Sequence, residues 1–232
     1  MNIYAALVLC FIPFVTAFIL AKILVPQLKI RYELWGTLIA LLSVIPIVFI
    51  QFTLHDLPFF NSRTYLSLLL TAVIFNGLIE EMAKMIFMLL LPSKRQQLSA
   101  FFATAVICGF AFGSFESVIY FLKELQKITA TGTSLLYNQI FLRMFTSVII
   151  HAVCAGFSGL YIWSYRIHQP HISPFLWAAV LHGLYNFFSF FTSDIKWFSI
   201  AALLFALTEC RLWYKRIAET DINVLDKKVN KH

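Results

Sequence analysis

Seven apolar stretches divide this chain, and each is long enough to cross a lipid bilayer as an α-helix. They cover residues 3–21, 34–52, 65–91, 99–121, 138–163, 174–191 and 196–213. Of the 232 residues, 60% are hydrophobic and only 12% are charged, which is typical of a chain whose solvent is lipid. Because backbone polar groups in lipid need internal partners, we predict an all-α, polytopic membrane protein with about seven transmembrane helices.

Basic residues are divided unevenly between the two sides of these stretches. One side carries twelve Lys and Arg, six of them between Arg211 and Lys231, whereas the other side carries four. The positive-inside rule therefore predicts an N-terminus outside and a C-terminus in the cytoplasm. We expect a single transmembrane helical domain over residues 1–214 and a basic cytoplasmic tail over residues 215–232.

The net charge of +7 follows from this topology, so we expect the lipid bilayer of the cell membrane as a partner and no nucleic acid. The four cysteines lie within apolar runs and lack the paired spacing of a zinc ribbon, so we expect buried thiols. They are Cys10, Cys108, Cys154 and Cys210. The sequence predicts no particular oligomeric state.

The third apolar stretch, residues 65–91, is unusual because it contains Glu80, Glu81 and Lys84. Each ionisable group near the centre of a bilayer costs about 3 kcal/mol, so such groups face protein or water and suggest a function. The stretch is also longer than the roughly 20 residues that a crossing needs. We predict that it tilts, extends beyond the bilayer or breaks, with Asn76-Gly77 as the weak point.

The spacing of these three charges predicts a shared ion pair. Lys84 follows Glu80 by four residues and Glu81 by three, so on a helix it reaches either carboxylate and leaves the other available. A carboxylate left without a counter-ion suits a general base or acid. The spacing alone does not distinguish the two glutamates, and a polar clamp between helices without chemistry is the structural alternative.

Three later stretches add polar groups. Glu116 lies in the fourth, Arg143 and His151 lie in the fifth, and His182 and Asn186 lie four residues apart in the sixth. Two histidines facing three carboxylates and a lysine favour a functional site over isolated hydrogen bonds. By helical rise most of these groups fall near mid-membrane, whereas Glu116 lies roughly 10 Å nearer the outer face unless its helix outlasts the apolar run.

Four motifs in chain order resemble those of the PrsW family of intramembrane proteases, which is related to CAAX-prenyl proteases and bacterial self-immunity proteins. They are Glu80-Glu81-x-x-Lys84, Phe112-x-x-x-Glu116, His151 with Gly156, and His182-x-x-x-Asn186. The resemblance implies an intramembrane endopeptidase of the glutamate type, in which a glutamate assisted by histidine activates water. It implies no cofactor for that mechanism.

Amide hydrolysis requires a base for water, donors for the oxyanion and a proton for the leaving amine. We expect Glu80 or Glu81 to be the base, with Glu116 ordering the water or a histidine. The expected oxyanion and proton-transfer groups are His151, His182 and Asn186. The expected supporting residues are Lys84, Phe112 and Arg143.

The chain departs from CAAX proteases in two places, which affects the expected substrate. Those proteases have an arginine one position after Lys84 and a histidine at the position of Glu116. A prenylated substrate is therefore not expected. The PrsW resemblance implies instead a membrane-anchored protein with a single span, such as an anti-sigma factor, cut near its outer side.

Three alternative functions are also compatible with the polar residues of these stretches. Glutamates and histidines from several helices could bind zinc in a metalloprotease, although the HExxH signature is absent. Gly156-Phe157-Ser158-Gly159 imitates the box of a serine intramembrane protease, but that mechanism leaves the glutamate pair unexplained. A non-catalytic membrane scaffold or a proton-coupled transporter would use the carboxylates as a relay.

Overall fold

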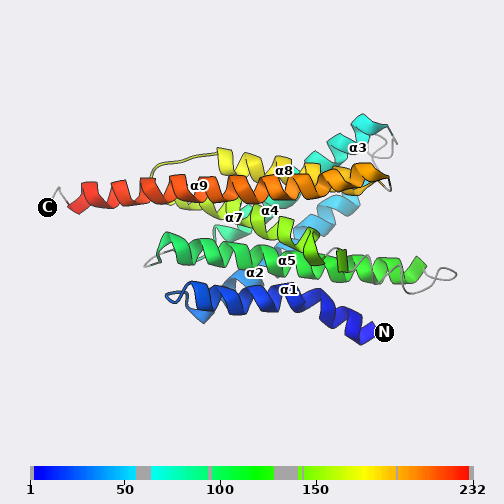
Figure 1. Cartoon of the computed structure of the whole chain (residues 1–232), viewed down its shortest axis with the longest axis horizontal. Helices are drawn as coiled ribbons and strands as arrows, with labels where there is room; N and C mark the ends of the chain where they lie inside the picture. The colour runs from blue at the N-terminus through cyan, green and yellow to red at the C-terminus, as the bar shows by residue number, and fades with distance from the viewer. Residues whose placement is uncertain are drawn as a thin grey trace.

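The computed structural model describes residues 3–55, 64–93, 96–127, 141–142, 144–191 and 193–229, and all of its elements are helical (Figure 1). The all-α prediction is thereby confirmed. The elements in order are α1 (Ile3–Leu24), α2 (Ile30–His55), α3 (Tyr65–Thr71), η1 (Ala72–Ile79), α4 (Glu80–Met88), α5 (Leu98–Lys127), α7 (Ser147–Arg166), α8 (Ser173–Ser189), η2 (Asp194–Trp197) and α9 (Phe198–Val229).

Helices α1, α5 and α9 lie along the long axis of one bundle, α3 is inclined to it, and the chain ends lie at opposite ends of the bundle (Figure 1). Within the described residues, five helical segments are long and apolar enough to cross a membrane. They are Tyr4–Leu24, Ile30–Gln51, Tyr65–Met88, Leu98–Lys123 and Ser147–Arg166. The last of these, α7, lies at the centre of the bundle and packs against α5, α8 and α9.

The third membrane segment does not break at Asn76-Gly77. Instead, α3 passes through a π-helical segment, η1, and continues directly as α4. A π-helix has wider turns than an α-helix, so it alters the direction of the side chains that follow, and such segments are frequent at functional sites. Here η1 ends one residue before the glutamate pair, so it sets the direction in which those glutamates point.

Glycines allow two pairs of helices to approach until their backbones touch. A Cβ atom on Gly109 of α5 would lie 2.3 Å from the carbonyl oxygen of His151 in α7. A Cβ atom on Gly183 of α8 would lie 2.6 Å from the Cα atom of Val73 in η1. Any larger residue would force these helices apart, so the glycines keep the polar residues of α4, α5, α7 and α8 within reach of one another.

Several helices end at other residues than the apolar stretches that predicted them. Helix α9 continues to Val229, so the last apolar stretch and the basic segment after it share one helix. Helix α5 continues to Lys127, several residues beyond its apolar run. Of the fifth apolar stretch, residues 138–140 and Arg143 lie outside the described residues. All four cysteines are buried and have free thiols, as expected.

Candidate active site

The ionisable residues predicted on four helices meet in one polar cluster within the bundle. Its members are Glu80, Glu81 and Lys84 of α4, Glu116 of α5, His151 of α7 and His182 of α8. All are buried except Glu116, whose side chain keeps 19% of its surface exposed. Buried charges at this density require close partners, and the contacts below supply most of them.

Glu81 is held on two sides in the deeper half of the cluster. Lys84 Nζ donates a hydrogen bond to Glu81 Oε1, and His182 Nδ1 lies 2.7 Å from the same oxygen. The ammonium group also lies 3.2 Å from His151 Nδ1 and 4.5 Å from the centroid of the Phe112 ring. Of the two glutamates that Lys84 could reach, it is therefore Glu81 that forms the ion pair.

Glu80 has a different environment. Its Oε1 accepts a hydrogen bond of 2.8 Å from Gln51 Nε2 at the end of α2. Its Oε2 is buried without a hydrogen-bond partner in the described part of the chain, and the same holds for His182 Nε2. These two atoms lie 3.9 Å apart. Glu80 thus presents one fixed oxygen and one available oxygen.

Glu116 contacts the cluster through His151, although its position in the fourth apolar stretch predicted a place nearer the outer face. Its Oε2 lies 2.8 Å from His151 Nε2 and accepts a hydrogen bond of 3.3 Å from Ser147 Oγ. Because the Lys84 ammonium can only donate to His151 Nδ1, the proton of a neutral His151 resides on Nε2 and points to Glu116. The rings of His151 and His182 are 4.6 Å apart, so the two histidines connect the carboxylates.

A cavity of about 470 Å³ opens beside the cluster, between α2, α3, η1, α4 and α5. Its lining residues are mostly apolar, but they include Glu80, Glu116, Gln51 and Asn76. Glu81 does not line it. A cavity of this size with a few convergent polar groups is the usual form of a ligand site. The cavity thus distinguishes the two adjacent glutamates, which the sequence could not.

Two predicted residues lie outside these contacts. Asn186 is half-buried one turn after His182 in α8, and its side chain makes no hydrogen bond to any residue that the structure describes. Arg143 lies outside the described residues. Conversely, Gln51 was not predicted as a site residue. The only sign of it in the sequence was its position as a polar residue near the end of the second apolar stretch.

Part of the cluster also fits a divalent metal. Glu80, His151 and His182 each offer one ligand atom, and these atoms lie within 4.8 Å of one another. Two imidazole nitrogens and one carboxylate oxygen are a frequent ligand set of catalytic zinc. Three carboxylates beside one ammonium group leave two uncompensated negative charges, which one divalent cation or two protons would balance. Zinc would have to compete for His151 with Lys84 and Glu116.

Comparison with known families relates this geometry to an activity. The family model described as PrsW family intramembrane metalloprotease matches residues 26–208, which include the whole cluster. The chain belongs to the PrsW family. It is therefore an integral, multi-pass membrane protein and an intramembrane peptidase. No curated protein and no solved structure matches this PrsW protein significantly.

Proposed function

We propose that this PrsW protein hydrolyses a peptide bond of a membrane-anchored protein by a glutamate-type mechanism with Glu80 as the general base. The observation that carries the proposal is the available Oε2 of Glu80, on a residue that lines the cavity and 3.9 Å from His182 Nε2. A base must reach both the substrate and the water that it activates. Of the two adjacent glutamates, Glu80 meets both conditions.

The attacking water would bridge Glu80 Oε2 and His182 Nε2, because two atoms 3.9 Å apart can both lie about 2.8 Å from one oxygen. Glu80 takes a proton from the water as its oxygen attacks the carbonyl carbon of the substrate. The same carboxyl group then returns that proton to the leaving amine. Gln51 holds the other oxygen of Glu80 throughout, which fixes the direction of the base.

The deeper half of the cluster would stabilise the negative charge that develops on the carbonyl oxygen of the substrate. Glu81 Oε1 lies 2.7 Å from His182 Nδ1 and fixes the direction of the ring, so that His182 Nε2, once it carries a proton, would donate to the oxyanion. Lys84 keeps Glu81 ionised through their hydrogen bond. Glu116 and His151 form a second proton path at the cavity wall. The roles expected for Asn186 and Arg143 remain predictions.

A zinc-dependent peptidase is the second candidate, favoured by the ligand set of Glu80, His151 and His182 and by the family description. These residues would hold the ion, which when bound supplies Lewis-acid polarisation and a more acidic water. In that case Glu116, with its oxygen 2.8 Å from His151, would orient a ligand rather than transfer protons.

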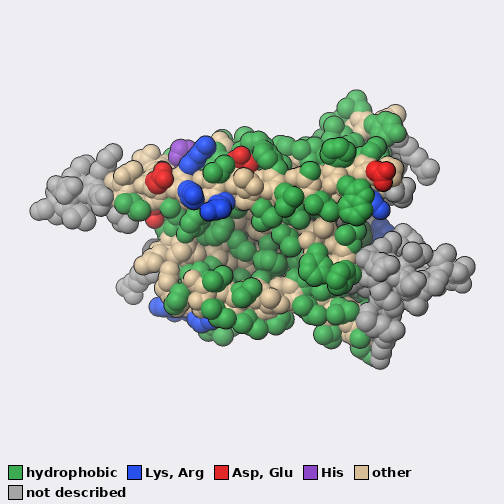
Figure 2. Space-filling view, in the orientation of Figure 1, with side chains coloured by type: hydrophobic (Ala, Val, Ile, Leu, Met, Phe, Trp, Pro, Cys, Tyr) green, Lys and Arg blue, Asp and Glu red, His purple; other side chains and the backbone are tan. Residues whose placement is uncertain are grey.

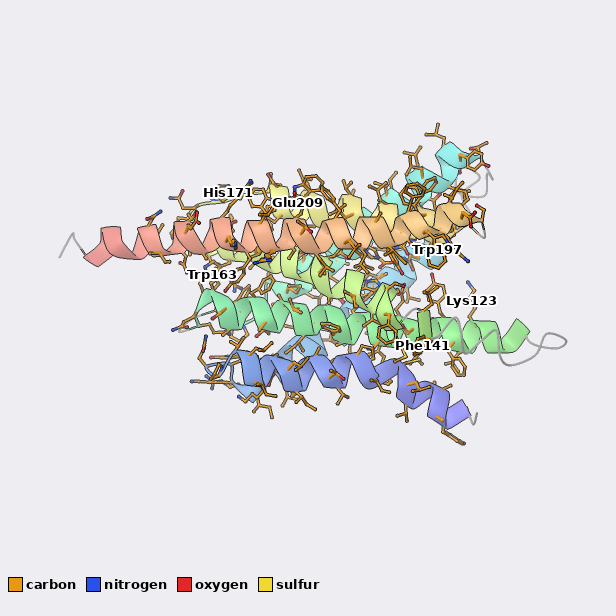
Figure 3. The ribbon with its side chains drawn as sticks, viewed as in Figure 1. Lys123, Phe141, Trp163, His171, Trp197 and Glu209 are labelled. Carbon is orange, nitrogen blue, oxygen red and sulfur yellow. The ribbon has the colours of Figure 1, made fainter. Side chains whose placement is uncertain are left out.

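We further propose that α8 and α9 cross the membrane as well, giving seven crossings with the N-terminus outside. Most basic side chains in Figure 2 lie toward the end of the bundle that carries the C-terminus, as a cytoplasmic end requires. Figure 3 shows Lys123 and Trp197 toward the opposite end, and Lys123 lines the cavity. A substrate with a single span, such as an anti-sigma factor, would then be cut near its outer side.

The test is cleavage of fluorogenic single-span peptides in liposomes by the purified protein. Three samples are compared: wild type, Glu80→Gln and Ser158→Ala, each with and without a zinc chelator. The proposal predicts that Glu80→Gln abolishes cleavage, while Ser158→Ala and the chelator leave it intact. Loss of cleavage on chelation, restored by added zinc, would replace the glutamate mechanism with the zinc-dependent one. Loss in Ser158→Ala would contradict both.

A further inference from the structure

We propose that a groove between α5, α7 and α9 binds one anionic phospholipid. The groove has a volume of about 360 Å³ and shares no residue with the cavity beside Glu80. Val106 of α5, Val153 of α7 and Leu207 of α9 line its apolar part. Leu207 is 43% exposed, and the groove residues of α5, Phe102 and Val106 among them, are half-buried, so the groove opens on the outside of the bundle, where lipid would lie.

The chemistry of the groove changes along its length. On α5 it runs from Phe102 to Phe110, a rise of about 12 Å along the helix. Phe102 lies next to Tyr214, with ring centroids 4.9 Å apart, and Arg211 lines the groove one turn before Tyr214. The end near Tyr214 therefore combines a cation with aromatic rings, whereas the end near Phe110 is apolar. This polarity matches that of a lipid with its headgroup at Arg211.

The charges favour an anionic headgroup as the occupant. Arg211 is exposed, and no ion pair joins it to an acidic residue that the structure describes. Lys215 is also exposed and lies one turn further along α9 on the same face. An arginine guanidinium binds phosphate through paired hydrogen bonds, and tyrosine is enriched at the depth of lipid headgroups. Figure 2 shows basic side chains on α9 toward this end of the bundle.

The same charges argue against a second copy of the chain in the groove. A symmetric contact through α9 would place Arg211 and Lys215 of one copy close to those of the other, and like charges at short range repel. A phospholipid has the opposite charge and supplies an acyl chain for the apolar part. The proposal is independent of the hydrolytic mechanism, since the groove includes no residue of the polar cluster.

The experiment is native mass spectrometry of the full chain in detergent, titrated with dioleoylphosphatidylglycerol or dioleoylphosphatidylcholine. We expect one phosphatidylglycerol per chain, bound at least about tenfold more tightly than phosphatidylcholine. Arg211→Gln should remove this preference, and Arg211→Lys should retain most of it. Arg31→Gln is the matched control, because Arg31 is an exposed arginine outside the groove.

A second pair of variants tests the apolar part of the groove. Leu207→Trp would fill it and weaken binding of both lipids, whereas Leu212→Trp would not, because Leu212 has a similar exposure and lies outside the groove. Equal binding of the two lipids to wild type would overturn the proposal, and so would an Arg211→Gln variant that keeps the preference. A dimer that Leu207→Trp dissociates, with lipid binding unchanged, would assign the groove to a second chain.

Discussion

The polar cluster has two sides that differ in what neutralises their charge. On the buried side, Glu81 is paired with Lys84 and bonded to His182, and it does not line the cavity. On the cavity side, Glu80 has a neutral amide as partner and one available oxygen. Two adjacent glutamates thus have opposite environments. The protein therefore compensates the inner charge itself and gives the outer carboxylate a neutral partner beside the cavity.

The largest effect on stability is expected when Lys84 is removed, because it is the only cation in the described part of the cluster. In Lys84→Met, the carboxylate of Glu81 would remain buried without its counter-ion, so unfolding free energy should fall by about 3–5 kcal/mol and cleavage should be lost. Thermal or SDS-induced unfolding in detergent measures this. Lys123→Met is the control, because Lys123 is exposed at the cavity and should change stability little. Equal stability of the two variants would refute the pairing.

A smaller effect is expected where η1 meets α8, the contact that brings His182 to the glutamates. In Gly183→Ala, the added Cβ would meet the backbone of Val73, so unfolding free energy should fall by about 1–3 kcal/mol. In the control Gly156→Ala, the nearest atoms belong to the Phe102 ring, at 3.1 Å, and this side chain can move. The same unfolding assay compares the two. If Gly183→Ala lost less unfolding free energy than Gly156→Ala, the contact between η1 and α8 would not need the close approach that Gly183 allows.

The smallest effect is expected on the cavity side, at the amide partner of Glu80. Gln51→Leu should slow cleavage about tenfold with little change in stability, because Glu80 Oε1 loses a donor and the base loses its fixed direction. Initial rates on a single-span peptide measure this. Thr53→Val is the control, since its hydroxyl bonds only within α2 among the described residues. An unchanged rate in Gln51→Leu would mean that Gln51 does not position the base.

The sequence predicted much of this architecture because lipid imposes strict rules. Apolar length locates membrane helices, and charged groups such as Lys84 and Glu116 are costly enough in a bilayer to mark a site. Which of Glu80 and Glu81 faces the cavity could not be predicted, since the π-helical turns of η1 change the direction of the residues that follow. Gln51 escaped prediction because an uncharged amide near a helix end is inexpensive.

We propose that Glu80 acts on the substrate while Glu81 supports the site. The most direct measurement compares Glu80→Gln with Glu81→Gln, recording the cleavage rate per folded molecule and the melting temperature of each. We predict that Glu80→Gln lowers the rate by at least about a thousandfold and keeps the wild-type melting temperature. Glu81→Gln should lower both, because Lys84 and His182 lose a charged partner. A folded Glu80→Gln variant that cleaves at the wild-type rate would contradict the account.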